Sequence, residues 1–477
     1  MNILREKIPD GVFDLIYLDP PFNSQKPYNV LFKEGLQESP SQVRAFEDTW
    51  HWTSETKQSF DWLVQNSTAE VSNLMIALEK LLGHNDILAY LTMMTIRLLE
   101  LHKVLKPTGS LYLHCDPTAS HYLKIVMDVI FGKKNFRNEI VWCYTGPSAA
   151  RKDFPRKHDI ILRYSKTDEP VFNPDDVKVP YSESFLSRRE YKEGKGGIYG
   201  GREEKGKDTE MYKEGKLVED WWNDIPSGGQ ISRTELLGYP TQKPEKLLER
   251  IILASSDKGS WVLDPFCGCG TTVAVAERLK RNWVGIDITI LAIHVIRDRL
   301  LRQFSSLNPE DLTIGGIPTD IASAKSFWKQ NPYQFQLWAC GLVNARPIDK
   351  KGADRGIDGV VIYVDAAKRK TIYKQGILQV KGGHVGVSQI RDLNGVLERE
   401  RAEFALFVTL EKPTREMEKE AVLAGTFKDH IGNEFPKIQI MTVEELLGGK
   451  KPNLPSSVQS PYKQASKTEL AEKLKLI

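Results

Sequence analysis

One nine-residue stretch, Asp14-Leu-Ile-Tyr-Leu-Asp-Pro-Pro-Phe22, constrains the fold more than any other part of the chain. Its run from Leu15 to Leu18 has the apolar composition of a strand buried on both faces, as in a parallel sheet. Two consecutive prolines lack the N–H groups that continue a strand ladder, so the strand must end there. The stretch therefore gathers a carboxylate, two proline carbonyls and an aromatic ring where open α/β sheets bind ligands.

This group of residues suits a flat base that carries an exocyclic amine. Because the amine lone pair is delocalised into the ring, the amine is a poor nucleophile. Asp19 and the carbonyl of Pro20 could accept its two N–H bonds, while Phe22 stacks on the extruded ring. The alternative is a strand that simply runs into a proline turn.

Length, charge and cysteine content bound the class of protein. A chain of 477 residues is expected to form two or three domains. With 66 Lys and Arg against 63 Asp and Glu, any surface for nucleic acid must be local. The five cysteines form no C-x-x-C pair, no apolar stretch approaches a membrane span, and the N-terminus has no signal-type core. We therefore expect a cytoplasmic protein without a membrane segment.

Helical and strand patterns alternate after the first strand. Residues 87–105 and 120–131 show helical spacing, whereas residues 110–115, 139–144 and 160–164 read as strands. This alternation predicts an α/β domain with a largely parallel sheet. Residues 25–67 are polar and aromatic and are expected to form a long ordered loop that leads into a helix.

Residues 187–216 have a different character. Nine basic and seven acidic residues are interspersed there with glycines and tyrosines. The stretch is either a solvated, partly disordered insertion or a mobile element that becomes ordered on DNA. Composition alone favours the first reading.

A second strong signal lies between residues 238 and 287. Gly238-Tyr-Pro-Thr-Gln-Lys-Pro244 leads into a helix, and a buried strand then reaches the glycine turn Asp264-Pro-Phe-Cys-Gly-Cys-Gly-Thr-Thr272. A helix and a strand ending in Asp287 follow. This order is typical of a nucleoside-binding unit, in which the glycines allow close backbone approach and the last acid accepts from a ribose diol.

The residues of the turn indicate which nucleoside is bound. A dinucleotide fingerprint would need a third glycine where Val273 stands, and Asp264 would repel a pyrophosphate. S-adenosylmethionine has no phosphate and carries a cationic sulfonium and ammonium, so an acid at this strand end is favourable.

Together these motifs resemble the amino-group DNA methyltransferases, in the permuted order in which the D-P-P-F motif precedes the cofactor motif. The resemblance covers about residues 1–325 and rests on six motifs in family order. They are D-L-I-Y-L-D-P-P-F, K-P-T-G-S-L-Y-L-H-C-D, H-D-I-I-L-R-Y-S-K, G-Y-P-T-Q-K-P-E-K-L-L-E-R-I-I, D-P-F-C-G-C-G-T-T and W-V-G-I-D. It implies a Rossmann-like methyltransferase fold and a target-recognition region at about residues 173–233. Relatives usually carry a glycine–aspartate strand before the D-P-P-F strand, and its absence leaves the sheet edge and the true start of the chain open.

The resemblance also implies roles for individual residues. The catalytic and base-holding set is Asp19, Pro20, Pro21 and Phe22. The cofactor set is Asp264, Phe266, Gly268, Gly270 and Asp287, with Thr241, Gln242 and Lys243 on its far side. The amine attacks the methyl group directly, so Cys267 and Cys269 are not proposed as nucleophiles. By analogy, Asp before the two prolines favours adenine N6 over cytosine N4, although both amines satisfy the hydrogen-bond argument.

A separate unit is expected at residues 326–445. Asp358 precedes one strand, and Gln379-Val-Lys381 ends the next, which is the spacing of a D…(D/E/Q)-x-K nuclease. Asp358 would bind Mg²⁺, Lys381 would polarise the attacking water, and Gln379 takes the second acidic position. The unit resembles the Mrr-type restriction endonuclease domain, a smaller α/β fold. The alternative is a degenerate copy kept for DNA binding, and residues 446–477 are expected to form a flexible tail with a short helix.

The complete interpretation is a two-enzyme chain of a restriction–modification or phage-defence system. Its partner would be double-stranded DNA, and its cofactors S-adenosylmethionine and, for the nuclease, Mg²⁺. A homodimer, an additional restriction or defence subunit, and a DNA-binding subunit that needs a partner for specificity or cleavage stay open.

Overall fold

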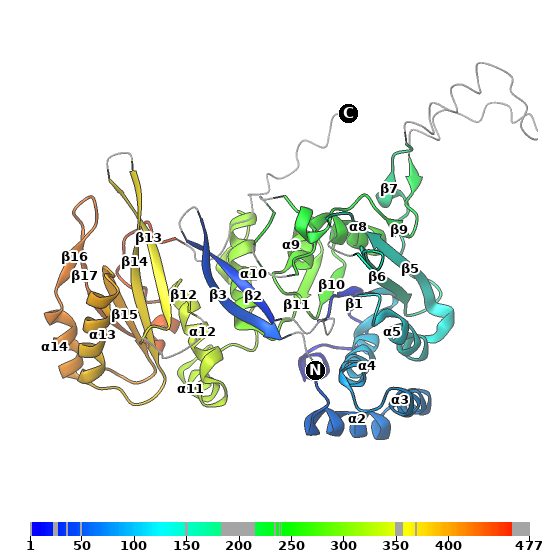
Figure 1. The fold of residues 1–477 in the computed structure, drawn as a ribbon, viewed down its shortest axis with the longest axis horizontal. Helices are drawn as coiled ribbons and strands as arrows, with labels where there is room; N and C mark the ends of the chain where they lie inside the picture. Colours follow the sequence, from blue (N-terminus) through cyan, green and yellow to red (C-terminus); the bar gives the residue numbers. More distant parts are fainter. Residues whose placement is uncertain are drawn as a thin grey trace, which may run out of the picture.

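The computed structural model describes residues 2–21, 27–34, 37–47, 50–147, 151–182, 215–232, 235–237, 239, 241–348, 356–367 and 370–459. In this part of the chain two β-sheets form two bodies, and the helices α10 (Ile290–Gln303) and α12 (Pro332–Leu342) lie between them (Figure 1). Within the described ranges no helix is long and apolar enough to cross a membrane.

The larger sheet has seven strands in the order β11-β10-β1-β4-β6-β5-β9. Its first four strands are parallel to one another. The strands are β1 (Phe13–Leu18), β4 (Leu105–Cys115), β5 (Phe136–Cys143), β6 (His158–Ser165), β9 (Trp221–Trp222), β10 (Trp261–Asp264) and β11 (Asn282–Gly285).

Strand β1 is buried on both faces, as its composition predicts. Ile16 and Leu18 face a core with the helices on one side of the sheet, whereas Leu15 and Tyr17 face a core on the other side. The first core is built with α2 (Ser54–Asn66), α3 (Ala69–Leu82), α4 (Asp86–Val104) and α5 (Ser120–Met127). The second is built with α8 (Glu245–Ser255) and α9 (Thr271–Arg278).

The expectation of a largely parallel sheet holds for only one half. Strand β6 is antiparallel to both β4 and β5, so the sheet is mixed. The remaining neighbours β5 and β9 are again parallel.

Two other expectations are corrected. The stretch expected as a loop contains a hairpin of β2 (Pro27–Glu34) and β3 (Gln37–Glu47) before α2 begins. The next strand was expected to start at Ser110, but β4 begins at Leu105, directly after α4, and runs through the Lys106–Gly109 stretch that was expected to separate helix from strand. The remaining short elements of this body are α1 (Asn2–Lys7), η1 (Asp128–Gly132), η2 (Lys133–Asn135), η3 (Asp175–Val177), β7 (Lys178–Val179), β8 (Lys216–Leu217), η4 (Gly228–Gln230) and η5 (Pro309–Asp311).

The smaller sheet has five strands in the order β12-β13-β14-β15-β18. Strands β12, β13 and β14 are antiparallel, and β14, β15 and β18 are parallel. Its elements are α11 (Ile321–Gln330), α12, β12 (Arg346–Pro347), β13 (Gly359–Ala367), β14 (Lys370–Lys381), α13 (Val387–Arg399), β15 (Phe404–Thr409), α14 (Arg415–Leu423), β16 (Thr426–Lys428), β17 (Glu434–Pro436), β18 (Ile438–Thr442) and α15 (Val443–Leu447).

The first part of the expected flexible tail is fixed on this sheet. The Val364 N–H donates to the Ser457 carbonyl at 3.2 Å, and the Gln459 N–H donates to the Ile362 carbonyl at 2.8 Å. These backbone bonds extend β13 at its free edge and hold the chain as far as Gln459. The expected C-terminal helix lies outside the described residues.

The two bodies meet through a close approach of α10 and α12. Leu291 and Val295 of α10 share one core with Phe335 and Trp338 of α12. A β-carbon at Gly341 would lie 1.9 Å from Cε1 of the half-buried His294 imidazole, so the glycine is what allows this close approach.

Candidate functional site

Three acidic residues follow the carboxyl ends of adjacent parallel strands. Asp19 follows β1, Asp264 ends β10 and Asp287 follows β11. Because β11, β10 and β1 are neighbours, these carboxylates lie at one edge of the sheet. A cavity of about 660 Å³ opens at this edge. Its lining includes Asp19, Pro20, Pro21, Thr241, Gln242, Lys243, Asp264, Phe266, Gly268 and Asp287.

Two residues of the expected set need separate mention. Phe22 lies outside the described residues. Gly270 shapes the turn and does not line the cavity: it is the left-handed N-cap of α9 with φ 73°. A β-carbon there would also lie 2.8 Å from Cγ1 of Ile296, so the glycine is required by backbone and by packing.

Of the two carboxylate oxygens of Asp19, one accepts a hydrogen bond from a lysine and the other accepts none from the described residues. Lys243 Nζ donates to Asp19 Oδ2 at 2.5 Å, and both side chains are largely buried. Asp19 Oδ1 is buried and has no hydrogen-bond partner among the described residues. A buried carboxylate oxygen without a donor is costly, so this atom is suited to accept an N–H from a ligand.

The residues expected on the far side of the cofactor, Thr241, Gln242 and Lys243, make different contacts. Lys243 reaches Asp19, whereas the Gln242 side chain locks the preceding loop: its Oε1 accepts from Leu237 N at 2.8 Å, and its Nε2 donates to the Glu235 carbonyl at 2.9 Å. Thr241 adopts φ 61°, which is strained for a β-branched residue. The strained backbone turns the chain so that residues 242 and 243 face opposite partners.

Asp264 sits at the bottom of the glycine turn. Its Oδ1 accepts from Phe266 N at 3.0 Å, and its Oδ2 accepts from the Thr272 hydroxyl at 2.5 Å. Burial raises the pKa of Asp264 to about 7, and these two bonds and the nearby Asp19 and Asp287 modify that effect. A carboxylate in this position favours a cationic ligand, because a cation offsets the cost of burying the negative charge.

Asp287 fixes the other end of the turn. Its Oδ2 accepts from Gly268 N at 3.0 Å, and its Oδ1 accepts from both N and Oγ1 of Thr289 at 2.9 Å. Burial raises the pKa of Asp287, and these bonds oppose the increase. Next to it, the apolar Ile288 is 90% exposed.

These residues fit S-adenosylmethionine. Asp264 supplies the negative charge that a sulfonium and an ammonium require, and Asp287 lies where a ribose diol can donate to it. A β-carbon at Gly268 would approach the Tyr239 ring to 3.3 Å, so the glycine keeps this wall of the cavity open. The glycine turn and the two acids fit a nucleoside without a phosphate, because carboxylates at this edge would repel one.

A buried hydrogen-bonded chain behind the cavity was missed by the sequence reasoning. The Tyr17 hydroxyl lies 2.9 Å from His114 Nδ1, and His114 Nε2 lies 3.1 Å from Asp159 Oδ2. The Tyr144 hydroxyl donates to Asp159 Oδ1 at 3.2 Å. Burial raises the Asp159 pKa, but the hydrogen bonds from His114 and Tyr144 and the charges of His114 and Lys243 together outweigh burial, so the net shift is downward. The signal was present in the L-Y-L-H-C-D and H-D-I-I-L strands, where His114 and Asp159 are polar residues within apolar runs.

Four further lining residues carry no local signal in the sequence. Trp50 and Arg97 line the cavity from the methyltransferase-like part, and Asn331 and Gln334 line it from the start of α12. Arg97 Nη1 donates to the Met93 carbonyl at 3.0 Å, and burial lowers its pKa. Only the packing of distant segments brings these side chains to the cavity.

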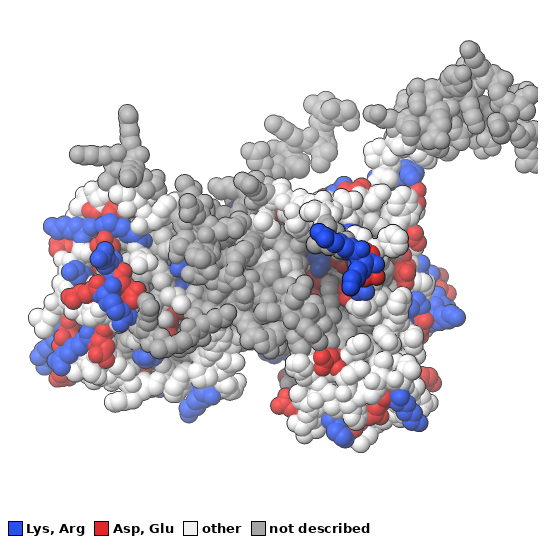
Figure 2. Space-filling view, in the orientation of Figure 1, with Lys and Arg blue, Asp and Glu red and all other residues white. Residues whose placement is uncertain are grey.

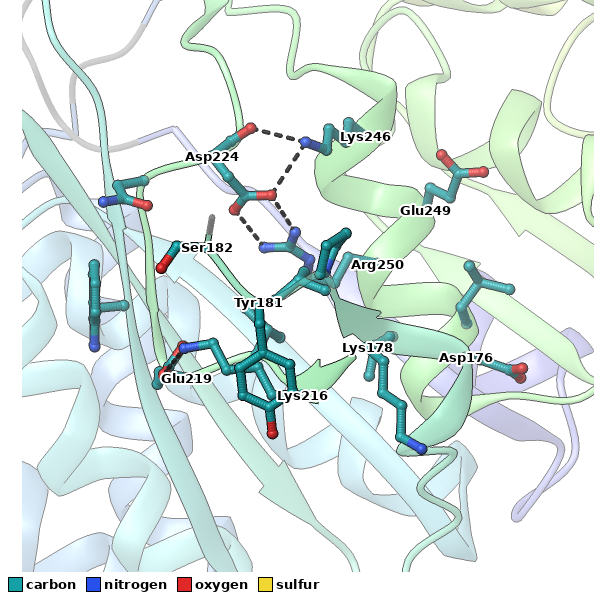
Figure 3. Close-up of a pocket in the computed structure, with 17 residues that line it drawn as sticks. Asp176, Lys178, Tyr181, Ser182, Lys216, Glu219, Asp224, Lys246, Glu249 and Arg250 are labelled. Atoms are coloured by element: carbon teal, nitrogen blue, oxygen red, sulfur yellow. Dashed lines mark hydrogen bonds and ion pairs between the residues drawn. The ribbon is translucent and has the colours of Figure 1, made fainter. Parts of the chain in front are cut away.

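A second cavity, of about 700 Å³, lies at the base of the expected target-recognition region (Figure 3). Arg250 donates to both carboxylate oxygens of Asp224, at 2.9 and 2.6 Å, and Lys246 donates to the same residue. Lys216 pairs with Glu219 on the opposite wall. Because carboxylates pair with these cations, the arrangement does not favour an anionic ligand in this cavity.

The residues expected in the nuclease site lie on adjacent strands of the smaller sheet. Asp358 Oδ2 accepts from Val380 N at 2.7 Å, and its Oδ1 accepts from Gln336 Nε2 at 2.8 Å. Gln379 Oε1 is buried and has no hydrogen-bond partner among the described residues. Lys381 follows two residues later, on the same face of β14. The contact from Gln336 was not anticipated.

These donors only partly fit a magnesium site. The oxygens of Asp358 and Gln379 are the hard ligands that Mg²⁺ prefers. The described ranges contain no group of three or more His, Cys, Asp or Glu residues that could hold a metal ion. One carboxylate and one amide would hold Mg²⁺ less firmly than two carboxylates.

Comparison with known proteins identifies the class that this fold and site define. Residues 13–298 match the model of the DNA methylase family, and the chain belongs to that family. Residues 329–446 match the restriction endonuclease family, so the chain also carries an endonuclease domain of that family.

Individual relatives agree with this assignment. The type II methyltransferase M.HpaI of Haemophilus parainfluenzae is 30% identical over 226 residues, covering 47% of this chain and 63% of the relative. M.BamHI of Bacillus amyloliquefaciens is 30% identical over 300 residues, covering 62% of this chain and 54% of the relative. The DNA adenine methyltransferase YhdJ of Escherichia coli is 28% identical over 286 residues, covering 59% and 74%. The chain thus spans 63% and 54% of the first two relatives' own length.

Proposed function

We propose that the chain methylates DNA at the exocyclic amine of a flipped base, with adenine N6 as the target. Asp19 Oδ1 carries this proposal, because it is a buried acceptor without a described partner, in the same cavity as the two cofactor-type acids. Adenine is favoured by the analogy with D-P-P-F enzymes and by the similarity to the DNA adenine methyltransferase YhdJ. Cytosine N4 is the alternative within the same family.

The chain's own residues account for activation of the amine. Lys243 holds Asp19 Oδ2, so Oδ1 accepts one amine N–H and the Pro20 carbonyl accepts the other. The lone pair of the amine nitrogen is then no longer delocalised into the base, so the nitrogen can act as a nucleophile. S-adenosylmethionine supplies the methyl group when it is bound. The proton that the amine nitrogen loses passes to solvent, and no covalent bond to the chain forms.

Methylation of plasmid DNA with S-adenosylmethionine tests this proposal. The purified chain should incorporate methyl groups, and digestion of the product with nuclease and phosphatase should yield N6-methyl-2′-deoxyadenosine. Asp19→Ala should abolish transfer and leave the affinity for S-adenosylmethionine in isothermal titration nearly unchanged, because Asp264 and Asp287 lie at the cofactor. Loss of cofactor affinity would show that Asp19 is misplaced, and N4-methyl-2′-deoxycytidine would select the alternative base.

We infer a second activity for residues 326–445, namely cleavage of DNA with Mg²⁺. The match to the restriction endonuclease family supports it, together with Asp358, Gln379 and Lys381 on adjacent strands. Asp358 and Gln379 would hold the ion, and Lys381 would orient the attacking water. A tethered nuclease must spare the sites that its own partner domain modifies, so we expect cleavage of unmodified DNA.

Incubation of unmethylated phage DNA and of self-methylated plasmid with Mg²⁺ tests the second activity. Lys381→Ala should remove cleavage and leave methylation unchanged, because the two sites lie on different sheets. If neither DNA is cut with any divalent metal, the domain binds DNA without cleaving it. Cleavage of the self-methylated plasmid alone would contradict the restriction–modification logic.

The described residues on the face shown in Figure 2 form no extended basic surface. On the face shown in Figure 2, basic and acidic side chains of the described residues are intermixed, as the net charge of +3 predicts. We propose that residues 173–233 supply part of the DNA contact. Their central part lies outside the described residues.

A further inference from the structure

The cofactor cavity is not formed by the methylase-matching residues alone. Asn331 and Gln334 line it as well, and both lie within residues 329–446, which match the restriction endonuclease family. They share the cavity with Asp287, Ile288 and Thr289, at the end opposite the Asp19 stretch in the order of the sheet. A side chain of the endonuclease domain therefore faces the ligand site of the methylase domain.

Hydrogen bonds hold the side-chain amides of Gln334 and Asn331 in place. Gln334 Oε1 accepts from Ile290 N at 3.5 Å, so its carboxamide lies at the first turn of α10, directly after Asp287–Thr289. Asn331 is the N-cap of α12, and its Oδ1 accepts from Gln334 N at 3.0 Å. The packing of α10 against α12 fixes both residues relative to the cavity.

The chemistry of this end of the cavity matches a purine ring. Asp287 lies where the ribose diol donates, and the purine extends beyond the ribose. Ile288 offers an exposed apolar side chain against which a flat ring can pack. The edge of adenine presents an amine donor beside a ring-nitrogen acceptor, and a carboxamide matches both groups.

We propose that Gln334, assisted by Asn331, binds the adenine ring of S-adenosylmethionine, so that both domains of the chain build the cofactor site. This inference rests on the proposed methyltransferase function. It assigns to the endonuclease domain a contact with the methyl donor that the methylase match does not contain. The cofactor then stabilises the contact between the two domains, because it binds residues of both.

Isothermal titration of the full-length chain with S-adenosylhomocysteine tests the proposal. Gln334→Ala removes the amide, and Gln334→Glu keeps an acceptor for Ile290 N while removing the donor. Both variants should bind roughly five- to tenfold more weakly, the effect of losing about one hydrogen bond. Asn331→Ser keeps a capping oxygen and should weaken binding by about twofold or more. The matched control is Gln330→Ala on α11, whose side chain bonds Ser326 and does not line the cavity; its affinity should equal that of the wild type.

Two purine analogues separate a direct contact from an indirect effect. The 1-deaza and 7-deaza forms of S-adenosylhomocysteine each lack one ring nitrogen. For one of them the difference between wild type and Gln334→Ala should become smaller, because the acceptor of the amide N–H is gone and only the bond from the adenine amine to the amide oxygen is left. Equal weakening with all three ligands would mean that Gln334 acts only through Ile290, which would overturn the proposal.

The remaining outcomes are also decisive. If the wild type binds S-adenosylhomocysteine and the Gln334 variants bind it equally well, the proposal fails and the methyltransferase function stands. If the wild type itself does not bind this ligand, both fail together.

Discussion

Lys243 Nζ lies 2.5 Å from Asp19 Oδ2, although 224 residues separate the two in the chain. The contact joins the T-Q-K-P segment to the D-P-P-F segment and leaves Asp19 Oδ1 as the open acceptor of the cavity. The family resemblance implied a place for Lys243 at the cofactor. In the structure the Lys243 ammonium instead donates to Asp19, the proposed catalytic carboxylate.

Replacing Lys243 by methionine should impair methyl transfer more than cofactor binding. The variant keeps the length of the side chain but leaves Asp19 without its charged donor, and breaking a buried charged pair costs about 2 kcal/mol or more. Turnover in a methylation assay should therefore fall roughly 30-fold or more, with a change in S-adenosylmethionine affinity below about twofold. In an Asp19→Ala background the same replacement should have no further effect. An equal loss of S-adenosylmethionine affinity and of turnover would show that Lys243 acts in cofactor binding.

Cofactor affinity should depend on pH through Asp264. Burial raises its pKa to about 7 in the free protein, whereas a bound cation favours the ionised form. Below pH 7 binding must also displace a proton, so affinity should fall by about tenfold between pH 8 and pH 6. Titrations at several pH values measure this. Asp264→Asn should bind the cofactor weakly at both pH values. Any pH dependence of affinity that this variant retains arises from the amino group of the ligand itself. A wild-type slope equal to that of the variant would contradict the assignment.

Replacing His114 by leucine should destabilise the fold. The Tyr17 hydroxyl and one oxygen of Asp159 would lose their partner in a buried position, which costs about 2–3 kcal/mol. Urea unfolding should show this loss in the free energy of unfolding. His121→Leu is the matched control, because His121 is exposed on α5 and should change the value by less than about 0.5 kcal/mol. Equal stability of the two variants would show that the buried chain is not structural.

Deletion of residues 188–214 should alter DNA binding without unfolding the protein. Strands β7 and β8 pair at Lys178↔Leu217 and Val179↔Lys216, so the described chain on the two sides of the segment is close together, and a short glycine linker can replace the segment. The deletion must stop before Lys216, which belongs to this pairing. Removal of its Lys and Arg residues should weaken DNA binding about tenfold or more at low salt or change the methylated site. Unchanged DNA affinity and site choice, with cofactor affinity intact, would make the segment a passive insertion.

The sequence predicted the parts of this site that depend on short-range patterns. Asp19 was placed at the ligand-binding end of its strand, and Asp264 and Asp287 were placed in one nucleoside-binding unit, because each acid follows an apolar strand. The family match confirmed the interpretation of these motifs. Their individual roles remain predictions.

Contacts between distant segments could not be predicted in this way. The sequence around Lys243 does not indicate that it contacts Asp19. Likewise, the sequence around Gln336 does not indicate its contact with Asp358. Both contacts exist only after the sheets assemble. The antiparallel half of the larger sheet was missed for the same reason: a strand's apolar pattern does not encode its direction. Gln242 was assigned to the cofactor, yet its amide is committed to the loop backbone, which a motif cannot distinguish.

Gly341 beneath His294 has a consequence for how such fused enzymes can be rebuilt. An endonuclease domain taken from a relative with any larger residue at this position cannot dock on α10, however well it folds alone. Chimeras should therefore exchange the segment from α10 to α12 as one unit, with its glycine and histidine kept as a pair. A junction placed in the linker between them would leave two intact domains with mismatched surfaces.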